Sequence, residues 1–138
     1  ISAMAVGVGR AAFEYSANYA REREQFGRPI IANQGVSFML ADMDISLDAA
    51  RLLTWRAGSI IARGDPCSLE EASKAKAFAA DTTMKVTTDA VQVCGGLGFM
   101  RDLPVEKWMR DAKIFQIYEG TSQIQREVIA RSIATRNF

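Results

Sequence analysis

The sequence predicts an all-α protein built as an antiparallel four-helix bundle. Its 138 residues contain long segments in which apolar residues recur every three or four positions, the spacing of one helix face. Only three prolines interrupt the chain, and no segment shows the alternation of a half-buried strand. Long helices joined by short turns pack against their sequence neighbours in opposite directions, so we expect one bundle domain over residues 1–138.

The first two predicted helices are separated by a glycine turn. The first runs from about Met4 to Glu22, and a turn follows at Phe26–Pro29. The second runs from about Asn33 to Arg63 and ends at Gly64-Asp65-Pro66. The apolar face of the first helix is predicted to contain Met4, Val8, Ala11, Tyr15 and Tyr19. That of the second contains Val36, Leu40, Met43, Leu47, Ala50, Leu53, Ala57 and Ile60, with Met39 as additional core filler.

The second half of the chain predicts two more helices. Ser68 and Glu71 have the spacing of a capping box that opens the third, and Gly95-Gly96 ends it. A short turn or helix covers Val105–Arg110, and the last helix runs from Thr121-Ser122 to about Thr135, with Ser122 and Gln125 as a second capping box. The third helix presents small residues that permit close packing: Ala72, Ala75, Ala79, Thr83, Val86, Ala90 and Val93.

Composition excludes several classes of function. The net charge of +1 gives no general attraction to nucleic acid or anionic membranes, and no apolar run is long enough to span a bilayer. Histidine is absent, which removes imidazole catalysis and most metal sites, so we expect no metal. Two cysteines are too few for a disulfide framework and favour a reducing compartment: the cytoplasm of a bacterium or the mitochondrial matrix of a eukaryote. The chain starts Ile1-Ser2-Ala3, as if cut inside a helix, so we expect a fragment of a longer protein.

Three short segments can be interpreted in two ways each. The arginines of Arg21–Arg28 could bind a phosphate, or they could form charge pairs at a solvated helix end. The glycines of Gln92–Phe99 could let a cofactor approach the backbone, or they could simply stop a helix. Glu119, in Ile117–Gln123, could be a base aimed by its turn, or an acid that suits a helix N-terminus. Taken one at a time, each segment favours its structural interpretation.

Taken together and in order, these segments resemble the C-terminal domain of the acyl-CoA dehydrogenase family. The resemblance covers nearly the whole chain and is most specific over residues 110–126. The matching segments are Arg23–Gly27, Asn33–Met43, Ala75–Ala79, Asp89–Phe99, Pro104–Lys107 and Arg110–Arg126. The resemblance implies an enzyme whose N-terminal helical and middle β domains are absent from this chain.

The resemblance also implies a reaction, a cofactor and partners. An acyl-CoA thioester loses its α proton to a carboxylate and its β hydrogen, as hydride, to FAD, and a trans-2-enoyl-CoA forms, as in fatty acid β-oxidation. Glu119 stands where the family has its catalytic base. Its backbone N–H is then expected to stabilise the thioester carbonyl. The implied partners are an electron-transfer flavoprotein as acceptor and further copies of the chain, arranged as a dimer of dimers.

The remaining site residues follow from the same resemblance. Arg23, Gln25, Phe26 and Gln34 match positions that reach the FAD of a neighbouring subunit. The run of Gln92, Val93, Cys94, Gly95 and Gly96 matches the segment that lines the ADP part of that neighbour's FAD. Thr121 and Gln123 match contacts to FAD in their own subunit, Gly120 a substrate contact, and Tyr118 the border of the acyl pocket.

Two alternatives stay open at this point. An acyl-CoA oxidase has the same fold but reoxidises its flavin with oxygen, whereas a nitroalkane oxidase is disfavoured because that relative has Asp where this chain has Glu119. A non-catalytic helical bundle that serves only assembly would be a different class. Neither the length nor the branching of the acyl group is readable from these residues.

Overall fold

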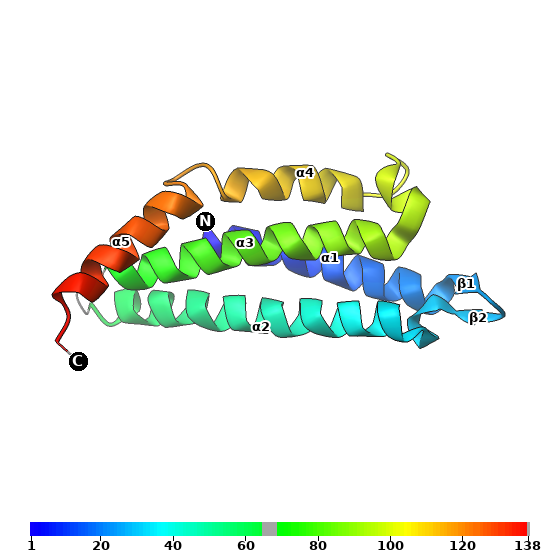
Figure 1. Cartoon of the computed structure of the whole chain (residues 1–138), viewed down its shortest axis with the longest axis horizontal. Coiled ribbons are helices and arrows are strands. Elements are labelled where there is room, and N and C mark those ends of the chain that lie inside the picture. The colour runs from blue at the N-terminus through cyan, green and yellow to red at the C-terminus, as the bar shows by residue number, and fades with distance from the viewer. Residues whose placement is uncertain (65–68, 138) are drawn as a thin grey trace.

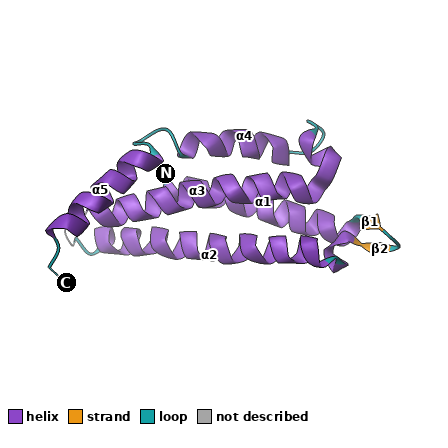
Figure 2. Ribbon diagram, in the orientation of Figure 1, coloured by secondary structure: helices purple, strands orange, loops and turns teal. Residues whose placement is uncertain are grey.

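A computed structural model describes residues 1–64 and 69–137, and these residues are predominantly helical (Figures 1 and 2). The predicted all-α class is therefore confirmed. The α-helices are α1 (Ser2–Glu22), α2 (Gln34–Ala62), α3 (Leu69–Cys94), α4 (Val105–Phe115) and α5 (Ser122–Thr135). Two short 3₁₀ segments, η1 (Ile30–Ala32) and η2 (Gly95–Phe99), precede α2 and follow α3.

Successive long helices run in opposite directions, and α3 contacts each of the other four α-helices (Figure 1). The fourth side of the bundle is shared by two shorter helices. Helix α4 packs on α1 and α3, while α5 covers the part of α3 near its N-terminal end (Figure 1). The predicted antiparallel four-helix bundle is thus present, with its fourth helix broken between Phe115 and Ser122. That break contains Glu119.

Small side chains let α1 approach both α2 and α3 closely. An added Cβ at Gly9 would lie 2.7 Å from Leu47 Cδ2 and 3.3 Å from Thr83 Oγ1. The Thr83 hydroxyl donates a 2.8 Å hydrogen bond to the carbonyl of Ala5, which joins α3 to α1 directly. The predicted small face of α3 is confirmed, since only Ala72 among its members is less than fully buried.

The predicted face of α1 is confirmed only in part, because Val8, Tyr15 and Tyr19 pack against the core without being fully buried. Met4 is 58% exposed, and Val8, Ala11, Tyr15 and Tyr19 are only partly covered. Smaller residues pack against the neighbouring helices instead, because they allow a closer approach than the larger ones. These buried residues are Ala5, Val6, Gly9, Ala12, Ser16, Ala17 and Ala20. In α2 the predicted core residues are buried or partly buried, with Met43 and Leu47 almost fully so.

The segments between the long helices differ from the prediction in two places. The turn after α1 is a small hairpin, in which β1 (Glu24–Gln25) pairs with β2 (Arg28–Pro29). Positive φ angles at Phe26 (55°) and Gly27 (76°) make its two-residue turn. Helix α4 continues to Phe115, beyond the predicted Arg110, because its apolar face stays in contact with α1 and α3.

The predicted caps also need correction. The N-cap of α5 is Thr121, whose hydroxyl accepts from Ile124 N at 3.2 Å, and not Ser122. Ser122 instead donates to Asp81 on α3, a contact that local spacing cannot reveal. The capping box predicted at Ser68 and the Asp65-Pro66 stop lie outside the described residues.

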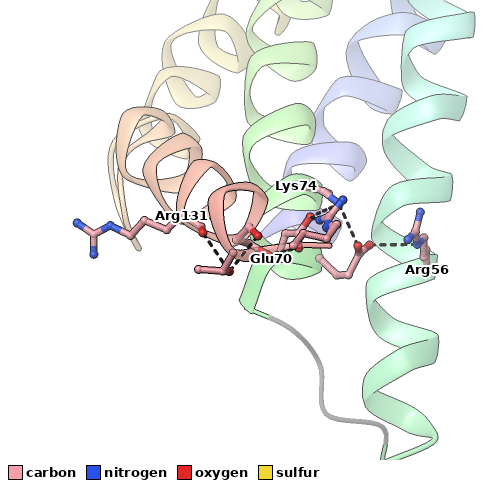
Figure 3. A network of polar contacts seen from close by, with 8 residues as sticks. Arg56, Glu70, Lys74 and Arg131 are labelled. Carbon is pink, nitrogen blue, oxygen red and sulfur yellow. Dashed lines mark hydrogen bonds and ion pairs between the residues drawn. The ribbon is translucent and has the colours of Figure 1, made fainter. Parts of the chain in front are cut away.

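A network of charged side chains fastens the C-terminal end of α5 to the start of α3 (Figure 3). Glu70 accepts from Lys74 at 2.5 Å and also from Ser132 and Arg136, while Glu71 joins Lys74 to Arg56 of α2. Because Glu70 is 93% covered, its charge depends on these partners.

Candidate functional site

Glu119 occupies a strained turn between α4 and α5. Its φ angle is 53° and that of Gly120 is 89°, so two consecutive residues have left-handed backbone. A left-handed conformation costs a residue with a side chain roughly 1–2 kcal/mol. A glutamate keeps it only where surrounding contacts hold it, and such strain is typical of functional positions. The Glu119 side chain is exposed, so its carboxylate is accessible from outside this chain.

The backbone around Glu119 offers a hydrogen-bond donor. Tyr118 N donates to Ile114 O, and Ser122 N donates to Gln116 O, so the amides that flank residues 119–121 are occupied. Among residues 1–64 and 69–137, none accepts a hydrogen bond from the Glu119 N–H. The base predicted from sequence therefore carries an acceptor side chain and an available donor on the same residue.

Three other predicted site residues, Tyr118, Thr121 and Gln123, lie beside this turn. Tyr118 is half-buried and contacts Phe115, with ring centroids 6.0 Å apart. Thr121 and Gln123 line a polar pocket of about 500 Å³ beside the turn. The remaining lining residues are Asp81, Lys113, Gln116, Ile117, Ser122 and Arg126.

Two residues of α3, Lys76 and Asp81, hold this turn, and sequence reasoning did not select them. Lys76 Nζ donates to Gly120 O at 2.5 Å. Asp81 accepts from Gln116 at 2.7 Å, Ser122 at 3.1 Å and Arg126 at 2.5 Å. A lysine on the small, buried face of a helix is the one local signal that could have drawn attention to Lys76.

A second group of predicted residues meets at the other end of α3. Arg23 and Gln25 line a pocket of about 410 Å³ together with Val93, Cys94, Gly95 and Gly96. Tyr19, Ile30 and Leu97 complete its lining. Arg23 is exposed, and within the described part of the chain no carboxylate forms an ion pair with it. An exposed guanidinium beside a pocket is available to an anion.

The glycines of this pocket leave their backbone open. Gly95 has a φ of 62°, which glycine adopts without cost, and a Cβ added at Gly96 would meet nothing within 4 Å. Internal packing therefore does not explain the absence of a side chain at Gly96. Cys94 is buried, and burial raises the pKa of its thiol to about 11, so it is protonated and unsuited to nucleophilic chemistry.

Three predicted residues lie outside the lining of this pocket. Phe26 is 93% exposed at the tip of the hairpin, and Gln34 and Gln92 are exposed on α2 and α3. The two groups of predicted residues are also far from each other. Val93 follows Lys76, which contacts Gly120, by 17 residues of α3, a separation of about 25 Å at ~1.5 Å per residue. One copy of the chain does not bring them together.

Two further features of the described residues bear on the function. In the described ranges, no cluster of three or more His, Cys, Asp or Glu side chains could hold a metal ion. None of the helices described here combines the length and apolar character that a membrane span requires.

The sequence and the fold agree with one known family. Residues 1–134 match the family model described as the acyl-CoA dehydrogenase C-terminal domain. The chain belongs to the acyl-CoA dehydrogenase family. An acyl-CoA dehydrogenase of Bacillus subtilis (strain 168) is 53% identical over 131 residues, which are 95% of this chain and 34% of that protein. This acyl-CoA dehydrogenase domain thus spans about a third of the length of that curated relative.

Solved structures contain the same domain. One, from work on the electron transferring flavoprotein of Acidaminococcus fermentans and flavin-based electron bifurcation, matches with a TM-score of 0.95 and 47% identity, covering 98% of this chain and 35% of that chain. The FAD complex of PigA matches with a TM-score of 0.92 and 29% identity, over 99% of this chain and 35% of that chain. Structures of this family therefore include complexes with FAD.

Proposed function

We propose that this chain is the C-terminal domain of an FAD-dependent acyl-CoA dehydrogenase in which Glu119 is the catalytic base. The observation that carries the proposal is the accessible Glu119 carboxylate on a strained, left-handed turn that the fold holds in place. The base takes the α proton of an acyl-CoA thioester, the β hydrogen leaves as hydride, and the electron pair of the α C–H bond forms the new double bond. The product is a trans-2-enoyl-CoA.

The donor next to the base supports this chemistry. Removal of the α proton places negative charge on the thioester oxygen, and a fixed N–H stabilises such charge. The free N–H of Glu119 is suited to that role, because its own chain provides no acceptor among the described residues. Tyr118 and Gly120 flank the base and are proposed to contact the acyl group and the rest of the substrate.

The residues of the second pocket fit a dinucleotide. Arg23 forms no ion pair with a carboxylate among the described residues and can bind a pyrophosphate, and the open backbone at Gly95 and Gly96 permits close approach of the ADP part. Phe26 and Gln34 are exposed and lie close to Arg23 in the sequence. Residues that reach a neighbouring subunit would be exposed in this way. When bound, FAD supplies the acceptor for the hydride.

The FAD site is proposed to form between two copies of the chain. The roughly 25 Å along α3 between the two groups of residues favours a site in which Thr121 and Gln123 come from one copy, and Arg23, Gln25 and Gln92–Gly96 from its neighbour. Helix α2 offers an unpartnered surface for assembly. Phe38, Ile45 and Leu52 recur every seven residues and are 63%, 68% and 63% exposed. Apolar residues at this spacing are typical of helices that pack on other helices.

The proposal is tested with the full-length enzyme, FAD and a panel of straight and branched acyl-CoA thioesters. We expect bleaching of the visible flavin band on addition of a good substrate, formation of the trans-2-enoyl-CoA, and reoxidation by an electron-transfer flavoprotein. Turnover that depends on oxygen instead, with production of hydrogen peroxide, would identify the oxidase alternative. Absence of enoyl-CoA from the whole panel would contradict both.

A further inference from the structure

Lys76 is a buried lysine with a specific backbone partner. It lies on the face of α3 that packs inside the bundle, and only 6% of its surface is exposed. An ammonium group removed from water is unfavourable unless it gains a strong partner. The Lys76 ammonium donates a 2.5 Å hydrogen bond to the carbonyl of Gly120, 44 residues away in sequence. The bond therefore joins the buried face of α3 to the residue that follows Glu119.

The surroundings of Lys76 show that its charge also acts on the turn. Burial lowers the pKa of Lys76, while the negative charges of Asp81 and Glu119 act in the opposite direction. Lys76 thus holds the backbone of the turn through a hydrogen bond, and its positive charge lies near the Glu119 carboxylate. A lysine that only filled space would need neither contact.

Asp81 fastens the turn at both of its ends. Gln116 precedes Glu119, whereas Ser122 and Arg126 follow it, and all three donate to the Asp81 carboxylate. Burial raises the pKa of Asp81, but the bonds from Arg126, Gln116 and Ser122 outweigh it and lower the pKa overall, so the carboxylate is ionised at neutral pH. Gln125 adds a donor from α5 to the carbonyls of Glu119 and Gly120.

We propose that Lys76, supported by Asp81, is a positioning residue for Glu119: it fixes the left-handed turn so that the carboxylate points at the α carbon of the substrate. This inference rests on the proposed function, in which Glu119 is the base. Without the Lys76 bond, the Gly120 carbonyl loses its closest partner, and the strained backbone at Glu119 can relax. The carboxylate would then leave its reactive position for most of the time.

The test uses the full-length holoenzyme with Lys76→Met, Lys76→Arg and the control Lys85→Met. Methionine keeps the apolar stem but lacks the donor and the charge. Lys85 is a matched control, because it lies on the same helix, 63% of its side chain is exposed, and it pairs with Asp89 away from the turn. A displacement of about 1 Å can reduce the rate roughly 10²-fold. We therefore expect Lys76→Met to lower kcat by about 10- to 100-fold.

Two readouts separate positioning from general damage. In Lys76→Met, kcat should fall much more than KM for acyl-CoA rises, and Lys76→Arg, which keeps a charged donor, should recover most of kcat. Hydrogen–deuterium exchange should show faster exchange of residues 116–123 in Lys76→Met and unchanged exchange in Lys85→Met. Wild-type kcat together with unchanged protection of residues 116–123 in Lys76→Met would overturn the proposal.

Failure of this inference is distinguishable from failure of the proposed function. If the wild-type enzyme turns over no acyl-CoA, the proposed function is wrong, and exchange at residues 116–123 still decides whether Lys76 holds the turn. If Lys76→Met does not yield folded holoenzyme, the same measurements are made on Asp81→Asn. Asp81 is the more exposed of the two residues that hold the turn. Loosening of residues 116–123 with a fall in kcat supports the proposal, and wild-type values of both contradict it.

Discussion

The ammonium nitrogen of Lys76 lies 2.5 Å from the carbonyl oxygen of Gly120 and so connects the N-terminal third of α3 to the turn that carries Glu119. The break between α4 and α5 is therefore held by side chains of α3. Lys76 binds the backbone in the middle of the break, and Asp81 accepts hydrogen bonds from residues at its two ends. The helices supply rigidity, and the interruption of the fourth helix exposes the proposed base.

We predict that the 138-residue chain, purified alone, is helical but colourless and catalytically silent. Its two groups of proposed cofactor residues are separated along the length of α3, so a single copy provides only half of each proposed FAD site. Far-UV circular dichroism and visible absorbance check this directly. Stoichiometric flavin together with dehydrogenase turnover in the isolated chain would contradict it.

A pair of glycines on α1 tests the packing of the bundle. Ala at Gly9 would meet Leu47, which is 2% exposed and cannot move freely, whereas Ala at Gly7 would meet nothing within 4 Å. Both changes gain up to about 1 kcal/mol of helix propensity, but overpacking costs about 1–3 kcal/mol. Gly7→Ala should therefore raise the free energy of unfolding. The free energy of unfolding of Gly9→Ala should be about 1–3 kcal/mol lower than that of Gly7→Ala. Urea unfolding measures both, and equal free energies of unfolding would show that α1 is not closely packed.

The Glu70 network predicts a dependence of stability on pH. Hydrogen bonds from Arg136, Lys74 and Ser132 lower the pKa of Glu70 to about 2 (Figure 3). The ordinary pKa of a glutamate is about 4.3, so between these two pKa values the unfolded state binds a proton at Glu70 and the folded state does not. The stability that Glu70 contributes is thus fully present above about pH 5 and is lost as the pH falls toward 2.

The comparison is between the wild-type chain and Glu70→Gln, with Glu127→Gln as the control. Glu127 is a half-exposed carboxylate that pairs with Arg131 at the surface. Glu70→Gln should be less stable at pH 7 and should lose less further stability between pH 5 and 2. An unfolding midpoint that falls with acid as steeply in Glu70→Gln as in Glu127→Gln would rule out this role of the network.

Subunit mixing tests the shared FAD site. In the full-length enzyme, Arg23→Ala and Glu119→Gln should each be inactive, the first because a charge-assisted contact of ~1.5–3 kcal/mol with the pyrophosphate is lost. If Arg23 acts on the neighbour's FAD, one hybrid site receives wild-type Arg23 and wild-type Glu119 from different chains. Mixed and exchanged subunits should then regain activity. No recovery after verified exchange would mean that Arg23 serves the FAD of its own subunit.

Much of the fold follows from local patterns, because period and residue size determine which helix face is buried. The small residues of α3 identified its core face correctly. On α1, Met4 was taken for the core but is exposed, and Tyr15 packs only against the edge of the core. The close approach of α1 to α2 and α3 instead buries the small residues Ala5, Gly9 and Ala12. Thr121 and Ser122 are both suitable caps, and only the tertiary bond from Ser122 to Asp81 decides between them.

The candidate site was less accessible to reasoning from residues alone. Local sequence favoured the structural interpretation of each segment, and only the family resemblance connected Arg23 with Gly95 and Gly96. Their meeting in one pocket depends on the bundle, which brings the end of α1 to the end of α3. Lys76 was missed because its partner is distant in sequence.

The most direct test of the account is the rate of Glu119→Gln in the full-length enzyme, measured beside Glu127→Gln. Glutamine has nearly the shape of glutamate but cannot accept the α proton, and removal of a general base typically costs ~10²–10⁴ in rate. We predict that Glu119→Gln folds, retains FAD and loses nearly all turnover, while Glu127→Gln, an exposed change on α5, stays active. Near-normal activity of a folded, FAD-loaded Glu119→Gln enzyme would show that Glu119 is not the base.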